Sequence, residues 1–119
     1  MELKTNSRWL PAARSEGDAI VARLKGEIDL NNSPELRGEL FGLMGRTPPR
    51  RLVLNLAEVP YMDSSAIAVL VEVLQKVRKQ GGKVWLTNLQ PRVQGLIEIA
   101  RLGTIFVVVK DEAEALATK

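Results

Sequence analysis

Short apolar runs alternate along the chain with longer segments in which apolar residues recur at helical spacing. The run LVLNL at 52–56 is almost continuously apolar, which is typical of a strand buried on both faces of a sheet. From Ser64 to Gln80 the apolar positions follow the helical period, so we expect this segment to be the most buried helix. Its apolar face comprises Ile67, Leu70, Val71, Leu74 and Val77, widened by Ala66, Val69 and Val73.

Three further helices are predicted from residues that begin or end a helix. In NNSPELRGELFGLMG, Ser33 precedes a proline and is the expected cap, and Gly45 can end the helix. In QPRVQGLIEIARLG, Pro91 lies near the start and Gly103 past the end. Asp111 can cap a last helix in EAEALAT.

The remaining apolar residues fall in extended segments. KVWLTNL and TIFVVV are predicted strands, and each follows a predicted helix. Near the N-terminus, RWLPA and DAIVARLKGEID form the two arms of a predicted hairpin. Its polar turn runs from Arg14 to Asp18 and contains Gly17. The predicted order of elements is therefore β-β-α-β-α-β-α-β-α.

This order predicts a single α/β domain over residues 1–119. Strands that alternate with helices pair in parallel through right-handed crossovers. We therefore expect a mostly parallel sheet with an N-terminal antiparallel hairpin and helices that connect the strands. A chain of 119 residues with 45% hydrophobic content is long enough for one core and too short for two comfortable domains.

The composition excludes several kinds of chemistry and partner. The chain has no histidine and no cysteine, which excludes imidazole bases, thiolate nucleophiles, disulfides and His/Cys metal sites. The net charge of +3 is scattered and only 4% of residues are aromatic, so we expect no direct contact with nucleic acid. The apolar runs are shorter than a membrane span and the N-terminus lacks an apolar signal segment, so we expect a cytoplasmic protein without membrane contact.

Asp63, Ser64 and Ser65 stand directly before the central predicted helix. The first N–H groups of a helix lack partners, and aspartate or serine side chains accept hydrogen bonds from them, so capping alone is one interpretation. A cap needs one such residue and three are present, so phosphorylation of one serine is a second interpretation. The positive end of the helix tolerates added negative charge. Phosphorylation would then change the surface and leave the fold intact.

The segment VLNLAEVPYMDSSAIAVLVEVLQKVRKQGGKVWL resembles the STAS domain of anti-sigma factor antagonists. The resemblance extends to GEID at 26–29 and to RLGTIFVVVKDEAEAL, and so covers nearly the whole chain. It implies that Ser64, the first serine after the aspartate, is the phosphoacceptor for an anti-sigma factor that is also a serine kinase. It also implies that the GEID loop lies beside the helix start, which brings Asp29 into the same docking surface.

The partner-binding residues implied by this resemblance are Asp29, Asp63, Ser64, Ser65 and Ala66. Asp63 matches the acidic position of the motif, and helix capping is its physical role. Ala66 stands where many members have glycine. Alanine favours a helix over glycine by about 1 kcal/mol, and we expect its methyl group to bring bulk close to a partner.

The resemblance implies a switch protein and not an enzyme. The unphosphorylated form binds the anti-sigma kinase and frees a sigma factor, phosphorylation on Ser64 releases it, and a separate serine phosphatase resets it. ATP belongs to the kinase, so no cofactor is expected in this chain. Two alternatives stay open: a STAS subunit of a stress-signalling scaffold or transporter assembly, and a small nucleotide-binding or enzymatic α/β domain.

Overall fold

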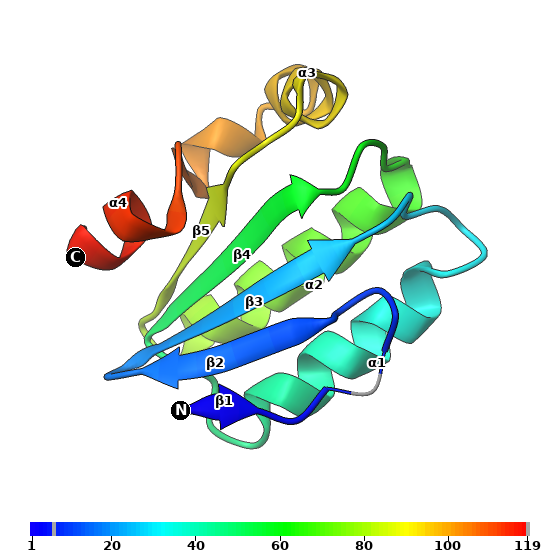
Figure 1. The fold of residues 1–119 in the computed structure, drawn as a ribbon. Coiled ribbons are helices and arrows are strands. Elements are labelled where there is room, and N and C mark those ends of the chain that lie inside the picture. Colours follow the sequence, from blue (N-terminus) through cyan, green and yellow to red (C-terminus); the bar gives the residue numbers. More distant parts are fainter. Residues whose placement is uncertain (6, 119) are drawn as a thin grey trace.

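The computed structural model describes residues 1–5 and 7–118, which form one mixed sheet flanked by helices (Figure 1). Within this part, six strands are neighbours in the sheet in the order in which they follow along the chain. The strands are β1 (Glu2–Leu3), β2 (Ala12–Glu16), β3 (Ala19–Lys25), β4 (Arg51–Glu58), β5 (Lys83–Thr87) and β6 (Val107–Val109). The helices are α1 (Ser33–Met44), α2 (Ser64–Lys79), α3 (Pro91–Ile99) and α4 (Glu112–Ala117), with a short 3-10 helix η1 (Leu102–Thr104).

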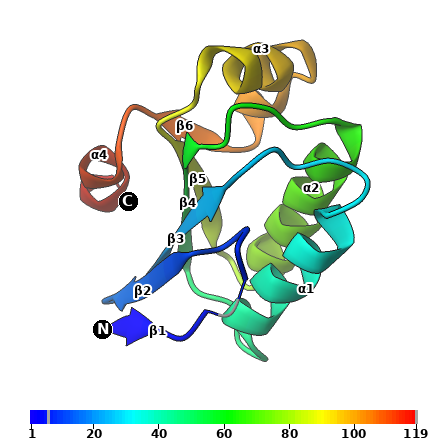
Figure 2. The same ribbon diagram turned by 45° about the vertical axis from the view of Figure 1, so that its right-hand side comes forward.

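The helices lie at three places around the sheet. Figure 2 shows α1 and α2 side by side on one face and α4 on the opposite face. In both views α3 sits at one end of the sheet, beyond β5. The loops that follow β3 and β4 reach the same end, which is where the carboxyl ends of the parallel strands gather. These loops therefore lie at an end of the sheet that α1, α2 and α4 leave open, with α3 beside them.

The sheet has an antiparallel part and a parallel part. β1 with β2 and β2 with β3 are antiparallel, whereas β3 with β4, β4 with β5 and β5 with β6 are parallel. Each parallel pair is connected by a segment that contains a helix, as a right-handed crossover requires. The predicted α/β fold, with a hairpin at its N-terminal side, is confirmed.

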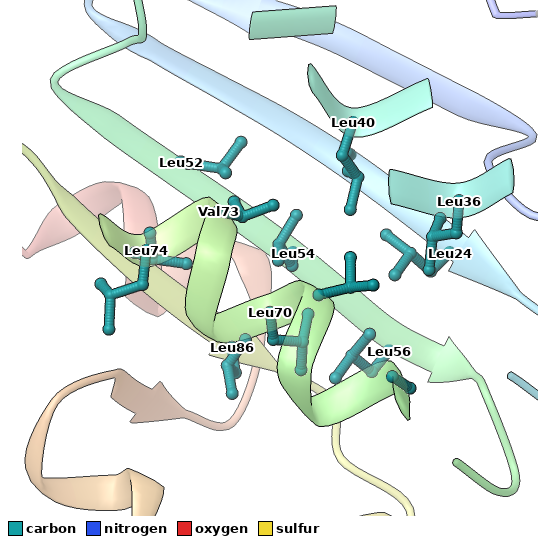
Figure 3. Packing of buried hydrophobic residues seen from close by; sticks show 14 of the residues in the cluster. Leu24, Leu36, Leu40, Leu52, Leu54, Leu56, Leu70, Val73, Leu74 and Leu86 are labelled. Atoms are coloured by element: carbon teal, nitrogen blue, oxygen red, sulfur yellow. The ribbon is translucent and has the colours of Figure 1, made fainter. Parts of the chain in front are cut away.

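The larger core lies between the sheet and the α1 and α2 layer. Alternate residues of β4, including Leu54, point into this core, while Val53 packs on the other face with Trp85 and Ala115. Both faces of β4 are therefore buried, and this explains the almost continuous apolar run in the sequence. Figure 3 shows Leu24, Leu36, Leu40, Leu52, Leu54, Leu56, Leu70, Val73, Leu74 and Leu86 of the larger core.

The predicted hairpin is correct in having Gly17 in its turn, and wrong in the bounds of that turn and in its first strand. Gly17 adopts φ of 58° in the turn, as glycine can without strain. The first arm is β2, which covers most of the segment predicted as a turn, and not RWLPA. The sequence of β2 looks like a turn because its polar side chains, Arg14 among them, lie on a sheet face with little helical cover. The short strand β1 was not predicted.

Two other predicted boundaries are wrong. Asn32 occupies the cap position of α1, and Ser33 is instead its first, buried residue. α3 begins at Pro91 and ends at Ile99, so Gly103 lies past its end as predicted, inside η1. The last strand begins only at Val107, since η1 occupies part of the residues before it. Two predictions are confirmed: Gly45 ends α1, and Asp111 caps the start of α4.

Candidate functional site

The loop after β3 and the start of α2 are joined by backbone hydrogen bonds. β3 ends at Lys25, so residues 26–29 form a loop and not the end of a strand. The N–H of Ile28 donates to the carbonyl of Tyr61 at 3.0 Å, and the N–H of Asp63 donates to the carbonyl of Ile28 at 3.1 Å. Two segments that are about thirty residues apart in the sequence are thereby fixed side by side. We call the surface formed by residues 26–32 and 61–65 the α2-start surface.

Asp63 caps α2, as predicted. Its Oδ1 accepts the N–H of Ser65 at 2.9 Å and that of Ala66 at 3.4 Å, and it also accepts the hydroxyl of Ser65 at 2.5 Å. Its Oδ2 accepts the N–H of Leu30 at 3.1 Å. The carboxylate therefore has two tasks, because it begins the helix and also holds the loop after β3 against that helix.

These hydrogen bonds lower the pKa of the Asp63 carboxyl. The hydroxyl of Ser65 is the largest cause. Burial, the next largest, acts in the opposite direction, and the backbone N–H groups of Ala66, Ser65 and Leu30 add to the lowering. The group is therefore ionised at neutral pH. A fixed negative charge thus lies next to Ser64 before any modification takes place.

The two serines of the motif have different environments. The Ser65 hydroxyl is half-buried and donates to Asp63, so the local structure already uses it. Ser64 is exposed at the first position of α2. Among the described residues, no hydrogen bond involves the Ser64 hydroxyl. Of the two, Ser64 is therefore the one that an approaching protein can reach without breaking a contact.

Asp29 lies in the loop beside Asp63 and organises the start of α1. Its Oδ1 accepts the N–H of Asn31 at 2.9 Å, and its carbonyl accepts the N–H groups of Asn32 and Ser33 at 3.2 and 2.8 Å. The side chain is half-buried, so part of it faces solvent. The structure thus brings Asp29, Asp63, Ser64 and Ser65 together on the α2-start surface.

Ala66 differs from the other four candidate residues because it is buried. Its relative exposure is 2%, and it belongs to the core between α2 and the sheet. The expectation that its methyl group adds bulk where a partner approaches is therefore wrong. The helical period explains the correction, since Ala66 lies on the inward side of the first turn of α2 while Ser64 lies on the outward side.

Sequence reasoning did not single out Leu30, although it belongs to the α2-start surface. The side chain is 73% exposed, and its N–H is the one that binds Asp63. Arg92, from the first turn of α3, stacks on the ring of Tyr61 at 4.9 Å from the centroid and extends the surface on one side. The sequence shows an apolar residue between Asp29 and two asparagines, which alone does not mark a site because single exposed apolar residues are common.

The chemistry available at this surface is limited. Among residues 1–5 and 7–118, no group of three or more acidic side chains is placed to hold a metal ion. The chain has no histidine, and Asp63 already accepts four hydrogen bonds, so neither offers a free base for Ser64. The Ser64 hydroxyl can receive a group from another protein that supplies its own base.

Within the part of the chain that the structure describes, no helix is both long and apolar enough to span a membrane.

Comparison with known proteins identifies the family. A family model described as the STAS domain matches residues 11–115. The chain belongs to the STAS-domain family. This confirms the resemblance that the Asp-Ser-Ser segment and its flanking strands indicated. The match runs from the start of β2 to α4 and so includes the whole α2-start surface.

Several relatives of the chain are named anti-sigma factor antagonists. The chain is 37% identical over 92 residues to the anti-sigma-B factor antagonist of Bacillus subtilis (strain 168), covering 77% of this chain and 82% of the relative. The unphosphorylated anti-sigma factor antagonist SpoIIAA superposes with a TM-score of 0.74 at 21% identity, covering 87% of this chain and 90% of that one. The phosphorylated form of SpoIIAA from Bacillus gives 0.68 at 20% identity, covering 88% and 95%. The two structural likenesses concern the fold, while the sequence match assigns the chain to the antagonist family.

Proposed function

We propose that this STAS protein is a phosphorylation-controlled antagonist of an anti-sigma factor that is also a serine kinase. Unphosphorylated, it binds the kinase through the α2-start surface and so frees the sigma factor. The kinase transfers the γ-phosphoryl group of ATP to the Ser64 hydroxyl, releases ADP and then dissociates. A separate serine phosphatase hydrolyses the phosphoserine and restores the binding form.

The observation that carries this proposal is the contrast between the two serines. Ser64 is exposed and its hydroxyl is uncommitted, whereas the Ser65 hydroxyl is held by Asp63 at 2.5 Å. Ser64 also occupies the first position of a helix of 16 residues, where the partial positive charge of the helix favours an anion. A phosphoryl group at this position adds about −1.5 to −2 charges at neutral pH. The helix can carry that charge, while a docked partner would have to desolvate it.

The remaining candidate residues take supporting roles in this proposal. Asp29 and Asp63 present carboxylates on the same surface, and the hydrogen bonds of Asp63 keep the loop and the helix start in one arrangement. Such preorganisation reduces the entropy lost when a partner binds. The protein acts by binding and not by catalysis, needs no cofactor of its own, and works in the cytoplasm where the kinase and the sigma factor reside.

Incubation with the purified anti-sigma kinase and radiolabelled ATP tests this assignment. We expect one phosphate per chain on Ser64 and no incorporation into Ser64→Ala. Ser65→Ala is the matched control, because it removes the neighbouring hydroxyl and keeps the acceptor. Phosphopeptide mapping that finds the label on Ser65, or an unlabelled wild-type chain, would contradict the proposal.

A further inference from the structure

Leu30 is the apolar residue of the α2-start surface. Within residues 1–5 and 7–118, the exposed large apolar side chains are Met1, Leu30, Ile99, Ile105 and Val108. Of these, Leu30 alone belongs to the loop that is bonded to the start of α2. Single exposed apolar residues are common on protein surfaces, so the 73% exposure of Leu30 carries no function by itself. A role for this side chain depends on the residues around it.

The loop around Leu30 is held by its own side chains. The N–H of Asp29 donates to Asn32 Oδ1, and the N–H of Asn31 donates to Asp29 Oδ1, each at 2.9 Å. The Asn32 amide in turn donates to the carbonyl of Glu27 at 2.9 Å. The backbone of the loop is therefore fixed on both sides of Leu30 while the leucine side chain points into solvent. A partner that covers this side chain has little loop disorder to overcome.

One carboxylate connects Leu30 to the phosphorylation site. Asp63 Oδ2 accepts the N–H of Leu30 at 3.1 Å, and Asp63 Oδ1 accepts the N–H of Ser65 at 2.9 Å. Ser64 stands between Asp63 and Ser65 in the sequence and is exposed. Leu30 and Ser64 therefore belong to two segments that Asp63 holds together, and one docking protein can contact both.

We infer that Leu30 is the apolar anchor by which this chain binds the anti-sigma kinase, and that Asp63 holds the leucine in position. The inference rests on the proposed function, because it names how that partner is recognised. The kinase would offer an apolar pocket that fits a leucine next to the groove that receives the Ser64 hydroxyl. Binding energy at protein interfaces concentrates in such buried anchors, surrounded by polar contacts of smaller effect.

This arrangement also gives a physical reason for release. A phosphoryl group on Ser64 would be forced against the apolar contact made by Leu30, and burial of an unpaired charge in such a place is unfavourable. Asp63, already ionised, offers the phosphate no compensation. Phosphorylation of Ser64 would therefore weaken the apolar contact that Leu30 makes with the kinase.

Calorimetry with the purified anti-sigma kinase and the unphosphorylated chain tests the anchor. We expect Leu30→Ala to weaken binding by at least about tenfold, Leu30→Asp to weaken it further, and Leu30→Met to stay near wild type. Ile105→Ala is the matched control. Ile105 is 39% exposed and lines a hollow with Arg78 and Gly81, at the end of α2 far from Ser64. The three Leu30 variants should melt close to wild type, because 73% of that residue is exposed. Ile105→Ala should remain folded, and its melting curve shows how much stability the partly covered side chain contributes.

The outcomes separate this inference from the proposed function. If Leu30→Ala binds as wild type does while Ser64→Asp binds weakly, the anchor is wrong and the switch stands. If Ile105→Ala weakens binding as much as Leu30→Ala, the loss is not specific to Leu30 and the anchor is again wrong. If the wild-type chain does not bind the kinase at all, the proposed function fails and the anchor fails with it.

A double-mutant cycle tests the positioning role of Asp63. If Asp63 acts through Leu30, Asp63→Ala should reduce affinity clearly in the wild-type background and much less in Leu30→Ala. Amide hydrogen exchange adds a measurement that a loss of helix capping alone would not change: the N–H of Leu30 should exchange faster in Asp63→Ala. Additive effects on affinity, or an unchanged exchange rate at Leu30, would show that Asp63 does not position Leu30 for binding.

Discussion

Two helices of this chain begin with a capping aspartate, and only one of the two positions has the features of a docking site. Asp63 begins α2 and Asp111 begins α4, on opposite faces of the sheet. Both accept backbone N–H groups of the first helical turn, Asp63 from Ser65 and Asp111 from Glu114, each at 2.9 Å. The capping geometry is therefore shared, and it does not distinguish a functional position from a structural one.

The residue after each cap makes the difference. After Asp111 comes Glu112, whose carboxylate binds Arg14 at 3.0 Å, Arg23 at 3.1 Å and Asn55 at 2.6 Å. This side chain fastens α4 to the open face of β2, β3 and β4. After Asp63 comes Ser64, which makes no such contact in the described part of the chain. A polar side chain that the fold does not use is free to interact with another protein.

The largest effect that this comparison predicts is on partner affinity. Phosphorylation of Ser64 should weaken binding to the anti-sigma kinase by at least about thirtyfold, because it places a doubly charged group in a docked surface. Ser64→Asp should weaken it in the same direction but less, since one carboxylate has less charge, and Asp29→Lys should weaken it as well. Isothermal titration calorimetry measures all three.

A charge added at the start of α4 is the control for this first prediction. Ala113→Asp introduces an exposed carboxylate in the first turn of that helix and should change affinity by no more than about twofold. Equal losses for Ala113→Asp and Ser64→Asp would mean that net charge governs binding and that the α2-start surface has no special role.

The next largest effect is on stability, at the other helix. Glu112→Ala should lower the free energy of unfolding by about 1–2 kcal/mol, since it leaves the largely buried Asn55 amide without its acceptor. The two arginines add less, because their side chains are 32% and 55% exposed and solvent screens them. Glu98→Ala, on the exposed side of α3, should change stability by less than about 0.5 kcal/mol in the same urea titration. A Glu112→Ala variant as stable as wild type would show that the cluster does not fasten α4.

The same contact predicts a dependence on pH. Burial alone would raise the pKa of Glu112, but hydrogen bonds from Asn55, Arg23 and Arg14 outweigh it and lower the pKa in the folded state. The unfolded chain therefore binds more protons, and the stabilisation is complete above the unfolded pKa and lost as pH falls through the folded pKa. Wild type should lose more stability than Glu112→Gln between about pH 5 and pH 2. Parallel losses in the two proteins would contradict the lowered pKa.

The parallel half of the fold was predictable, whereas the antiparallel edge was not. β4 and α2 bury whole faces, so their residues show clear periods in the sequence, and their predicted and observed bounds nearly agree. β2 has one buried residue, Ala13, among polar ones, because Glu112 and solvent satisfy its outer face without apolar cover. The Ala-Arg-Ser-Glu segment therefore has the composition of a turn, and long-range pairing with β3 overrides that local preference.

The candidate site shows the same division between local and long-range information. Asp63, Ser64 and Ser65 are adjacent in the sequence, so both the cap and the motif can be recognised there. The burial of Ala66 follows from the helical period, which places it on the apolar face of α2. The bond from the Leu30 N–H to Asp63 joins residues 33 positions apart, and no local pattern encodes it. Only the packed sheet brings these two segments together.

A smaller effect compares the two caps directly. Asp63→Ala should lower the melting temperature by about 4 °C, and Asp111→Ala should lower it by less. Asp63 begins a buried helix of 16 residues and also holds the loop at Leu30, whereas Asp111 begins a peripheral helix of 6 residues. Circular dichroism melting of the two variants measures the difference. An equal loss, or a larger loss for Asp111→Ala, would mean that the bond to Leu30 does not contribute to stability.

The smallest effect expected is that of Ser64 phosphorylation on stability itself. The phosphoryl group gains from the positive end of α2, a contribution of about 0.3–1 kcal/mol at an exposed position, and this opposes its repulsion from the ionised Asp63. Because Ser64 is exposed and its hydroxyl has no partner to lose in the described part of the chain, the two opposing effects leave the free energy of unfolding within about 1 kcal/mol of wild type. Urea titrations of the phosphorylated and unphosphorylated chains, followed by circular dichroism, measure the change, with Ser65→Asp as the contrast. That variant puts a carboxylate where the Ser65 hydroxyl now donates to Asp63, so it should be clearly less stable. A phosphorylated chain as destabilised as Ser65→Asp would mean that Ser64 is part of the fold, as Glu112 is, and not a surface left for a partner.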